Sequence, residues 1–363
     1  MFSSDKIEIR FSKFIRNFFF HVIFWYLSFL FYTFLTGEKQ LFKEYLNLLE
    51  IENTYWVILF LSILISILFT FIDGIFSDRL VRFFPRGFII LIRSVLYFAT
   101  AFVLILVAAK SPITNFPHQN YKELISYLPD INIVFIRFLV YFYLSGFLIN
   151  AVKGVIKKVG RGNFRSWILG LLNKPREEER IFMFIDMKSS TSIAEKLEHK
   201  KFSYLVQDVF NDLSIVDNYD GDIYQYLGDG AIISWSVKKG IKRDNSLNAF
   251  FAFNKLITKR SRYYQRKYGL VPKFKAGIHV GKVMVLQVGQ IRRDISYNGD
   301  TLNTAARIES MCGEYKQNLL ISGDLYQMIK DKKAFNFKEI DNIKLKGKRK
   351  SVVIYQVRPK TKS

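Results

Sequence analysis

The first 152 residues contain four long apolar runs, which limit what this chain can fold into. The runs cover residues 18–35, 55–76, 87–109 and 131–152. Each is near the length of about 20 residues that a helix needs to cross the hydrocarbon core of a bilayer. A buried helix of a soluble protein explains one such run, but not four in succession. We therefore predict a transmembrane domain of four helices in residues 1–152, which makes the lipid bilayer a partner of the chain.

The charges between these runs set the expected orientation. Cations gather before the first run, between the second and third, and after the fourth: Lys6, Arg10, Lys13, Arg16, Arg79, Arg82, Arg86, Lys153, Lys157, Lys158, Arg161 and Arg165. The positive-inside rule then places both termini in the cytoplasm, in agreement with an even number of spans. The charged start lacks a small-residue cleavage site, so we predict that the first run is retained. The expected location is the plasma (inner) membrane.

Three charged residues lie inside the apolar runs: Asp73, Arg93 and Arg137. Asp73 and Arg93 both lie toward the predicted cytoplasmic end and can pair across two helices. Intramembrane charges often mark a ligand or signal-coupling site. A structural ion pair near the interface, with long side chains that reach the headgroups, is the interpretation that we favour.

The formal charge of +23 is compatible with nucleic acid, an anionic membrane surface or a phosphate-rich substrate. The sequence contains no zinc-finger spacing or RNA-binding signature, so we predict no nucleic-acid partner. Cys312 is the single cysteine, which excludes an internal disulfide and fits a reduced compartment.

Residues 153–179 are basic, contain glycine and end in a strongly charged stretch, as expected of a cytoplasmic linker. Within them, residues 164–172 mix aromatic and aliphatic side chains with one arginine. This segment can lie in the membrane interface or pack on a partner chain, and the sequence favours neither. A soluble α/β domain is predicted for residues 180–363.

An apolar stretch at residues 181–185 is typical of a buried strand, and Asp186 follows it. Next comes a polar turn with Ser189, Ser190 and Thr191, and then a helical pattern. The free N–H groups at a helix start bind phosphate oxygens, and a carboxylate beside them can hold a cation. Taken alone, this turn is better explained as an ordinary helix N-cap.

Residues 222–235 alternate in the manner of two strands around Gly228-Asp229-Gly230, which predicts a hairpin with an acid at its tip. Asp-Gly turns are common for conformational reasons alone. If Asp229 lies beside Asp186, the two carboxylates can share two Mg²⁺ or Mn²⁺ ions. Hard cations prefer such oxygen ligands, and no His/Cys cluster offers a zinc site.

Two further segments contain candidate phosphate-binding groups. After a predicted turn at residues 298–300, Asn303 and Arg307 stand one turn apart on one helix face. They can present an amide to a ribose oxygen and a guanidinium to a phosphate. Lys346 lies in a short basic loop before a predicted strand at residues 352–357. Taken alone, each segment equally fits a solvated surface.

Five motifs in this order resemble the class III adenylyl and guanylyl cyclases over about residues 180–358. They are F-x-D-M-K-S-S-T at 184–191, Y-L-G-D-G at 226–230, A-G-I-H-V-G at 276–281, G-D-T-L-N-T-A-A-R at 299–307 and L-K-G at 345–347. The resemblance implies a ferredoxin-like α/β domain with an antiparallel sheet. A four-span anchor before it resembles a bacterial receptor-type cyclase.

The resemblance also implies roles for individual residues. Asp186 and Asp229 match the two metal-binding aspartates, which implies two Mg²⁺ or Mn²⁺ ions per active site. Asn303 matches the asparagine that orients the ribose, Arg307 the arginine that stabilises the pentavalent phosphorus, and Lys346 the lysine that binds the triphosphate. In this family one catalytic domain supplies the aspartates and a second supplies the other groups, so a homodimer is implied.

The sequence departs from the usual family pattern in two respects. The family's Gly-Phe-Thr after the first aspartate is Ser189-Ser190-Thr191 here, a change that we expect to have small consequences. The adenine-reading lysine of many adenylyl cyclases falls on Gln225, and its partner falls on Ser296. Both side chains can donate or accept a hydrogen bond, so they allow ATP and GTP.

The resemblance implies a lyase that converts ATP to 3′,5′-cyclic AMP and pyrophosphate. Use of GTP is the alternative within the same class. A receptor with an inactive, nucleotide-sensing cyclase domain is the alternative from another class. Inactive copies usually lack a metal aspartate or the arginine, and this chain has both, so we favour the enzyme.

Overall fold

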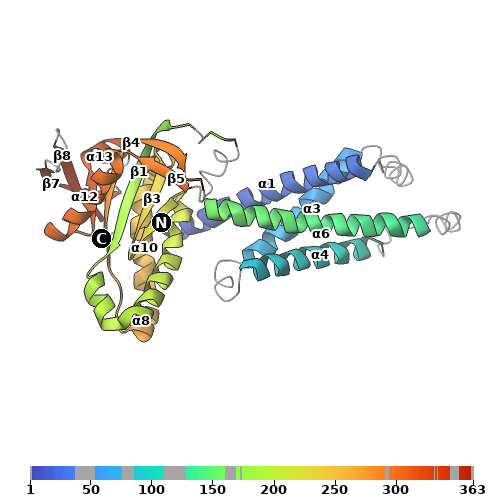
Figure 1. Cartoon of the computed structure of the whole chain (residues 1–363), viewed down its shortest axis with the longest axis horizontal. Helices are drawn as coiled ribbons and strands as arrows, with labels where there is room; N and C mark the ends of the chain where they lie inside the picture. The colour runs from blue at the N-terminus through green and yellow to red at the C-terminus, as the bar shows by residue number, and fades with distance from the viewer. Residues whose placement is uncertain are drawn as a thin grey trace. The chain divides into compact units, whose positions relative to one another are not determined.

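The computed structural model describes residues 2–36, 54–75, 86–109, 128–159, 169–171, 174–290, 294–330, 332, 334–343 and 351–360. The chain divides into two compact units, Met1–Lys158 and Val159–Ser363, which are both drawn in Figure 1. The expected linker, 153–179, includes the boundary between the two units, and its limits stay a prediction. The last helix of the first unit continues to Val159, and the first strand of the second unit begins at Arg176.

The first unit contains four long helices in its described part: α1 (Phe2–Thr36), α3 (Thr54–Ile75), α4 (Arg86–Ala109) and α6 (Leu128–Val159). They coincide with the four apolar runs, so the helices predicted from the sequence are confirmed. Trp25 and Phe142 are stacked with ring centroids 4.5 Å apart, and Phe69 and Tyr97 with centroids 3.9 Å apart. Such aromatic pairs bury much area and hold the helices together.

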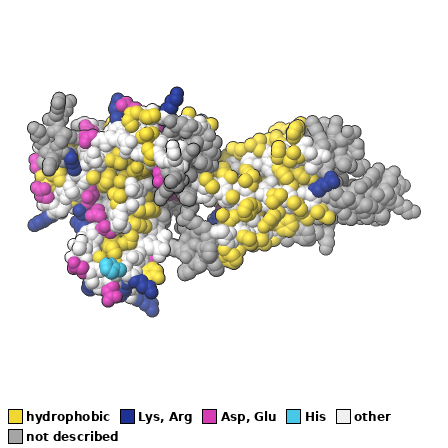
Figure 2. Space-filling view, in the orientation of Figure 1, with side chains coloured by type: hydrophobic (Ala, Val, Ile, Leu, Met, Phe, Trp, Pro, Cys, Tyr) yellow, Lys and Arg dark blue, Asp and Glu magenta, His cyan; other side chains and the backbone are white. Residues whose placement is uncertain are grey.

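The outward faces of these helices are also apolar. Large hydrophobic side chains are exposed on α1 (Phe19, Ile23, Leu27, Phe31 and Phe34), and Figure 2 shows hydrophobic side chains spread over the helical unit. In the described residues, Phe14–Thr36 and Ile136–Ile156 are long and apolar enough to cross a bilayer, whereas Ile58–Gly74 and Gly87–Thr100 are shorter. The number of spans therefore stays a prediction.

A buried polar cluster joins the four helices through one carboxylate. Asp73 of α3 accepts hydrogen bonds from the Tyr97 hydroxyl of α4 at 2.6 Å and from Lys153 of α6, and it contacts His21 Nε2 of α1 at 3.1 Å. Arg93 of α4 lies 3.8 Å from the same carboxylate. The predicted proximity of Asp73 and Arg93 is therefore present, and the ion pair that we favoured fits these contacts. Two contacts that were not predicted, with His21 and Lys153, extend it to α1 and α6.

The second unit is built on one sheet of eight strands, in the order β2-β3-β1-β4-β6-β8-β7, with β5 paired to β4. The strands are β1 (Arg176–Met187), β2 (Asp222–Leu227), β3 (Gly230–Ser236), β4 (Phe274–Val288), β5 (Asp294–Asn298), β6 (Leu319–Ser322), β7 (Phe335–Ile343) and β8 (Val352–Pro359). The helices are α8 (Ser190–Leu213), η4 (Ser214–Tyr219), α9 (Val237–Ile241), η5 (Lys242–Asp244), α10 (Asn245–Lys259), α11 (Ser261–Tyr268), α12 (Asp300–Glu314) and α13 (Gly323–Met328).

The sheet is mixed, so the expectation of an antiparallel sheet is wrong at one pair of strands. β4 and β6 run parallel, with Ala276 opposite Leu319 and Ile278 opposite Ile321, while the other pairs described are antiparallel. Helix α12 causes the difference. It carries the chain back along the sheet between the β4–β5 hairpin and β6, and a crossover helix of this kind joins parallel strands.

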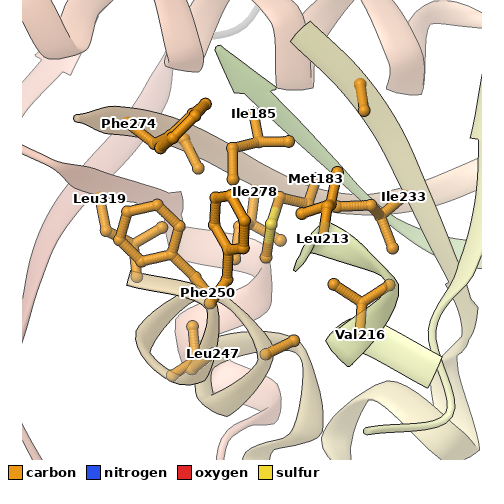
Figure 3. Close-up of a cluster of buried hydrophobic side chains, with 14 of the residues drawn as sticks. Met183, Ile185, Leu213, Val216, Ile233, Leu247, Phe250, Phe274, Ile278 and Leu319 are labelled. Carbon is orange, nitrogen blue, oxygen red and sulfur yellow. The ribbon is translucent and has the colours of Figure 1, made fainter. Parts of the chain in front are cut away.

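Side chains of β1 alternate between two hydrophobic clusters, one on each face of the sheet. Met183 and Ile185 point into the larger cluster, formed with α8, α10 and the neighbouring strands (Figure 3). Phe182 lies in the second cluster with Tyr297 and Ala305. A strand covered on both faces is apolar throughout, which explains why residues 181–185 contain no polar side chain. The first polar residue after that stretch is Asp186.

Candidate functional site

Asp186 and Asp229 lie side by side where β1 ends and the β2–β3 hairpin turns. β1 pairs with β3 up to Ile185 opposite Ala231, so the turn lies beside the end of β1. A Cβ atom placed on Gly230 would lie 2.8 Å from the Ile185 carbonyl oxygen and 3.1 Å from Asp186 Oδ1. Only glycine permits so close an approach of the turn to the acid. The hairpin with an acid at its tip is confirmed, and it brings the two predicted metal ligands together.

The two carboxylates form a centre of crowded negative charge. Burial, followed by the charges of Asp229 and Glu309, raises the pKa of Asp186 to about 6, and the Lys275 cation partly opposes that rise. Lys275 Nζ lies 3.6 Å from Asp186 Oδ2. A carboxyl with a pKa raised by an adjacent carboxylate is one that a bound cation would stabilise in its charged form.

Lys275 and Glu309 belong to this site, although the sequence analysis did not select them. Lys275 lies directly opposite Asp186 in the β1–β4 pairing, and its Nζ is 2.8 Å from Glu309 Oε1. Glu309 is carried by α12, so Lys275 connects the end of β1 with that helix. The sequence signal was a cation directly before the motif at residues 276–281. The position of this cation opposite Asp186 can be recognised only when the register of β1 and β4 is known.

Asn303 and Arg307 lie on the less buried side of α12, one turn apart as predicted. The opposite side of the helix packs so closely on β4 that a Cβ atom on Gly277 would lie 2.7 Å from the Ala305 carbonyl oxygen. The contacts that the structure gives for Asp186 are with Asp229, Lys275 and Glu309, and Glu309 stands on the same helix as Asn303 and Arg307. The acid pair and the amide–guanidinium pair are thus carried by different elements of the chain.

The neighbours of the two predicted base-reading residues contact each other. The rings of Tyr224 and Tyr297 have centroids 4.8 Å apart, and the Tyr297 N–H donates to the Tyr224 hydroxyl at 3.5 Å. The β4–β5 hairpin thus curls over one face of the sheet and reaches β2. Gln225 follows Tyr224 in β2, and Ser296 precedes Tyr297 in β5. Gln225 is exposed and Ser296 is half-buried.

The polar turn after β1 keeps the backbone shape that a glycine would favour. Ser189 precedes α8 with φ 56°, in the left-handed region, and its side chain makes no capping hydrogen bond. The Ser189 side chain therefore does not cap the helix in this structure. Ser190 and Thr191 begin the helix, so their N–H groups belong to its first turn. Lys346 falls in residues 344–350, outside the described residues.

The acid pair fits a hard divalent cation. Both donors are carboxylates, and the part of the chain that the structure describes contains no group of three or more His, Cys, Asp or Glu side chains that could hold a metal. Mg²⁺ typically takes one or two protein carboxylates and completes its coordination with substrate phosphates and water. Asp186 and Asp229 match that pattern and would hold such an ion together with a nucleotide.

Residues 172–359 match the family model described as the adenylate and guanylate cyclase catalytic domain. The chain belongs to this family. The matched cyclase domain makes up more than half of the chain, and it contains every residue of the acid pair, of the α12 face and of the tyrosine contact.

Similarity to individual cyclases extends over part of their length. The chain is 30% identical over 228 residues to adenylate cyclase 2 of Rhizobium meliloti (strain 1021), which covers 62% of this chain and 61% of that protein. It is 29% identical over 187 residues to adenylate cyclase 1 of the same organism, which covers 50% of this chain and 27% of that one. The match thus spans less than two thirds of either relative.

A solved structure shares the fold of the cyclase domain. The structure of a bacterial light-regulated adenylyl cyclase aligns with a TM-score of 0.51 at 18% sequence identity, over 60% of this chain and 63% of that one. At this identity the likeness concerns the fold alone.

Proposed function

We propose that this chain is a membrane-bound adenylate cyclase that converts ATP to 3′,5′-cyclic AMP and pyrophosphate as a homodimer. The observation that carries the proposal is the contact between Asp186 and Asp229, at the family's metal-binding positions. Burial, together with the neighbouring charge of Asp229, raises the pKa of Asp186 to about 6, as expected of a site built for a cation.

Asp186 and Asp229 would hold two Mg²⁺ or Mn²⁺ ions in each active site. When bound, such ions lower the pKa of the ribose 3′-hydroxyl and neutralise phosphate charge. Lys275 Nζ lies 3.6 Å from Asp186 Oδ2, and this contact would keep the Asp186 carboxylate oriented toward the site.

The other residues act on the nucleotide directly. The 3′-oxygen of the ribose forms a bond to the α-phosphorus while the bond from that phosphorus to the bridging oxygen breaks, and the 3′-proton passes to substrate or water. Asn303 orients the ribose. Arg307 places positive charge where negative charge develops on the α-phosphate. Lys346 and the N–H groups after Ser189 bind the triphosphate, whose negative charge a helix start favours.

Two chains would build each site. One supplies Asp186 and Asp229, and the other supplies Asn303, Arg307 and Lys346. The family resemblance supports this division, because in such cyclases one catalytic domain supplies the aspartates and a second supplies the other groups. Exposed apolar side chains offer a surface for the partner on β2 and on β4: Tyr226, Leu227, Met284 and Val288. Apolar exposure of this kind marks protein interfaces.

The helical unit would anchor the enzyme in the inner membrane, with multiple spans and both termini in the cytoplasm. The two long apolar segments and the exposed apolar side chains of α1 support membrane insertion. The cytoplasmic side is also where a nucleoside triphosphate is available. ATP is favoured over GTP because the curated relatives described above are both named adenylate cyclases.

The direct test is turnover by the purified full-length protein with Mn²⁺ and either ATP or GTP, with products identified by mass. We expect cyclic AMP and pyrophosphate in equal amounts, and no cyclic product from Asp186→Asn. That variant should remain folded and dimeric, because Asp186 lies at the end of its strand and outside the hydrophobic clusters. Cyclic GMP as the main product would replace the substrate assignment, and full activity of Asp186→Asn would refute the metal site.

A further inference from the structure

We infer that Asn298 determines the choice of purine by fixing the direction of the Ser296 hydroxyl hydrogen. The inference rests on the proposed function, in which Ser296 contacts the base. The Ser296 hydroxyl donates a hydrogen bond to Asn298 Oδ1 at 3.0 Å. An amide oxygen can only accept, so the single hydroxyl hydrogen is engaged and the oxygen retains lone pairs for another partner.

The strand that carries this pair is held firmly. Ser296 and Asn298 are alternate residues of β5 and therefore project from the same face, opposite Leu286 and Met284 of β4. Between them, Tyr297 projects from the other face and is buried. Its ring contacts Phe182, with centroids 5.4 Å apart, and it lies 4.9 Å from the Arg180 guanidinium.

The end of β5 is also fixed by Gly299, at a position that only glycine fits. Gly299 adopts φ 151°, a conformation that other residues rarely take, and a Cβ atom there would lie 3.2 Å from the Lys282 carbonyl oxygen. The chain turns at this point into α12. The buried Tyr297 between them and Gly299 after them therefore fix the positions of Ser296 and Asn298 in the strand.

A hydroxyl held as an acceptor discriminates between purines at position 6. Adenine presents an N6 amino group there, which can donate to Ser296. A 6-oxo purine in the same pose presents an oxygen, so two acceptors would face each other with no hydrogen between them. An unpaired polar group in a binding site typically changes selectivity by about 10–100-fold. Gln225 does not set this preference, because its amide can donate or accept by rotation.

The test compares ATP with inosine triphosphate, which carries the 6-oxo group without the 2-amino group of guanine. In the full-length enzyme, Asn298→Leu removes the acceptor at similar volume, and Asn298→Ala removes it with a smaller side chain. Asn298→Asp restores an acceptor-only partner and serves as the matched control. The measured quantity is kcat/KM for ATP divided by kcat/KM for inosine triphosphate.

We expect this ratio to fall about tenfold in Asn298→Leu and Asn298→Ala, because the freed hydroxyl can donate to the 6-oxo group. It should be retained in Asn298→Asp. In a Ser296→Ala background, Asn298→Leu should cause no further change, since Asn298 acts through Ser296. Purine riboside triphosphate, which has no group at position 6, should react equally well with the unmutated enzyme and Asn298→Leu.

An unchanged ratio in both Asn298→Leu and Asn298→Ala would overturn the inference. A similar fall in the Ser296→Ala background would overturn it too, because Asn298 would then act independently of the hydroxyl. Binding of 3′-deoxy-ATP against 3′-deoxyinosine triphosphate separates this inference from the proposed reaction. If no cyclic product forms but binding shows the same dependence on Asn298, the reaction is refuted and the role of Asn298 stands.

Discussion

Gly230→Ala tests whether the close approach of the β2–β3 turn to Asp186 creates the metal site. The added Cβ would lie 2.8 Å from the Ile185 carbonyl oxygen, so backbone must move. Overpacking of this kind typically costs about 1–3 kcal/mol. The movement separates Asp229 from Asp186. Loss of the groups that hold a metal ligand in place typically lowers metal affinity by about 10–100-fold. The assay is Mn²⁺ titration of activity, together with thermal unfolding.

Gly228→Ala is the matched control on the other side of Asp229. Gly228 has φ 58°, and nothing lies within 4 Å of its added Cβ, so alanine there strains the backbone without pushing on Asp186. The left-handed conformation costs alanine about 1–2 kcal/mol. Both variants should unfold at lower temperature, by about 2–4 °C per kcal/mol. Only Gly230→Ala should need much more Mn²⁺. Equal Mn²⁺ requirements in the two variants would refute the reasoning.

Three further predictions concern other parts of the chain. Ser189→Gly should raise the unfolding temperature of the cyclase unit by a few degrees without loss of activity. Glycine adopts φ 56° without the steric cost of about 1 kcal/mol that serine has there. A lower unfolding temperature would contradict this prediction. Because the pKa of Asp186 is raised to about 6, its protonated form stabilises the metal-free fold at low pH and that stabilisation is lost as pH rises through 6. The Mn²⁺ concentration for half-activation should accordingly rise as pH falls from 7 to 5, by up to about tenfold per unit below 6, and a flat profile would contradict it. Asp73→Asn should destabilise the full-length protein in detergent by about 3 kcal/mol, because Lys153 loses the buried carboxylate that it contacts. Arg137→Gln, at an exposed position of α6, should not destabilise it. Equal unfolding temperatures of the two variants would contradict this prediction.

Local patterns in the sequence were sufficient to predict the elements that carry the site. Alternation and turn chemistry predicted the strand before Asp186, the hairpin around Asp229 and the helix that carries Arg307, because these depend on neighbouring residues. The mixed sheet was missed for the opposite reason. The direction of β6 depends on the path of α12 across the sheet, which no local pattern records.

Contacts between distant segments were also not predictable. Lys275 meets Asp186 only through the register of two strands that are far apart in sequence, and Tyr224 meets Tyr297 only because the β4–β5 hairpin curls. In the helical unit, hydropathy predicted the position of each helix, but it carries no information on rotation about the helix axis. The contacts of His21 with Asp73 therefore emerged only from the structure.

The central claim is that each active site combines the acid pair of one chain with Arg307 of another, and complementation of two inactive proteins tests it most directly. Asp186→Asn and Arg307→Ala are co-expressed, so that mixed dimers form in the membrane. One site of each mixed dimer carries both defects. The other combines intact acids from the Arg307→Ala chain with intact Asn303, Arg307 and Lys346 from the Asp186→Asn chain.

Random assembly of a two-fold dimer makes about half of the dimers mixed, and each has one intact site of two. The measurement is cyclic AMP formation by membranes from cells that co-express the two variants. The two chains carry different tags, which show that mixed dimers are present. The account predicts recovery to about a quarter of the unmutated activity, against none for either variant alone. No recovery in the presence of mixed dimers would contradict a site shared between two chains.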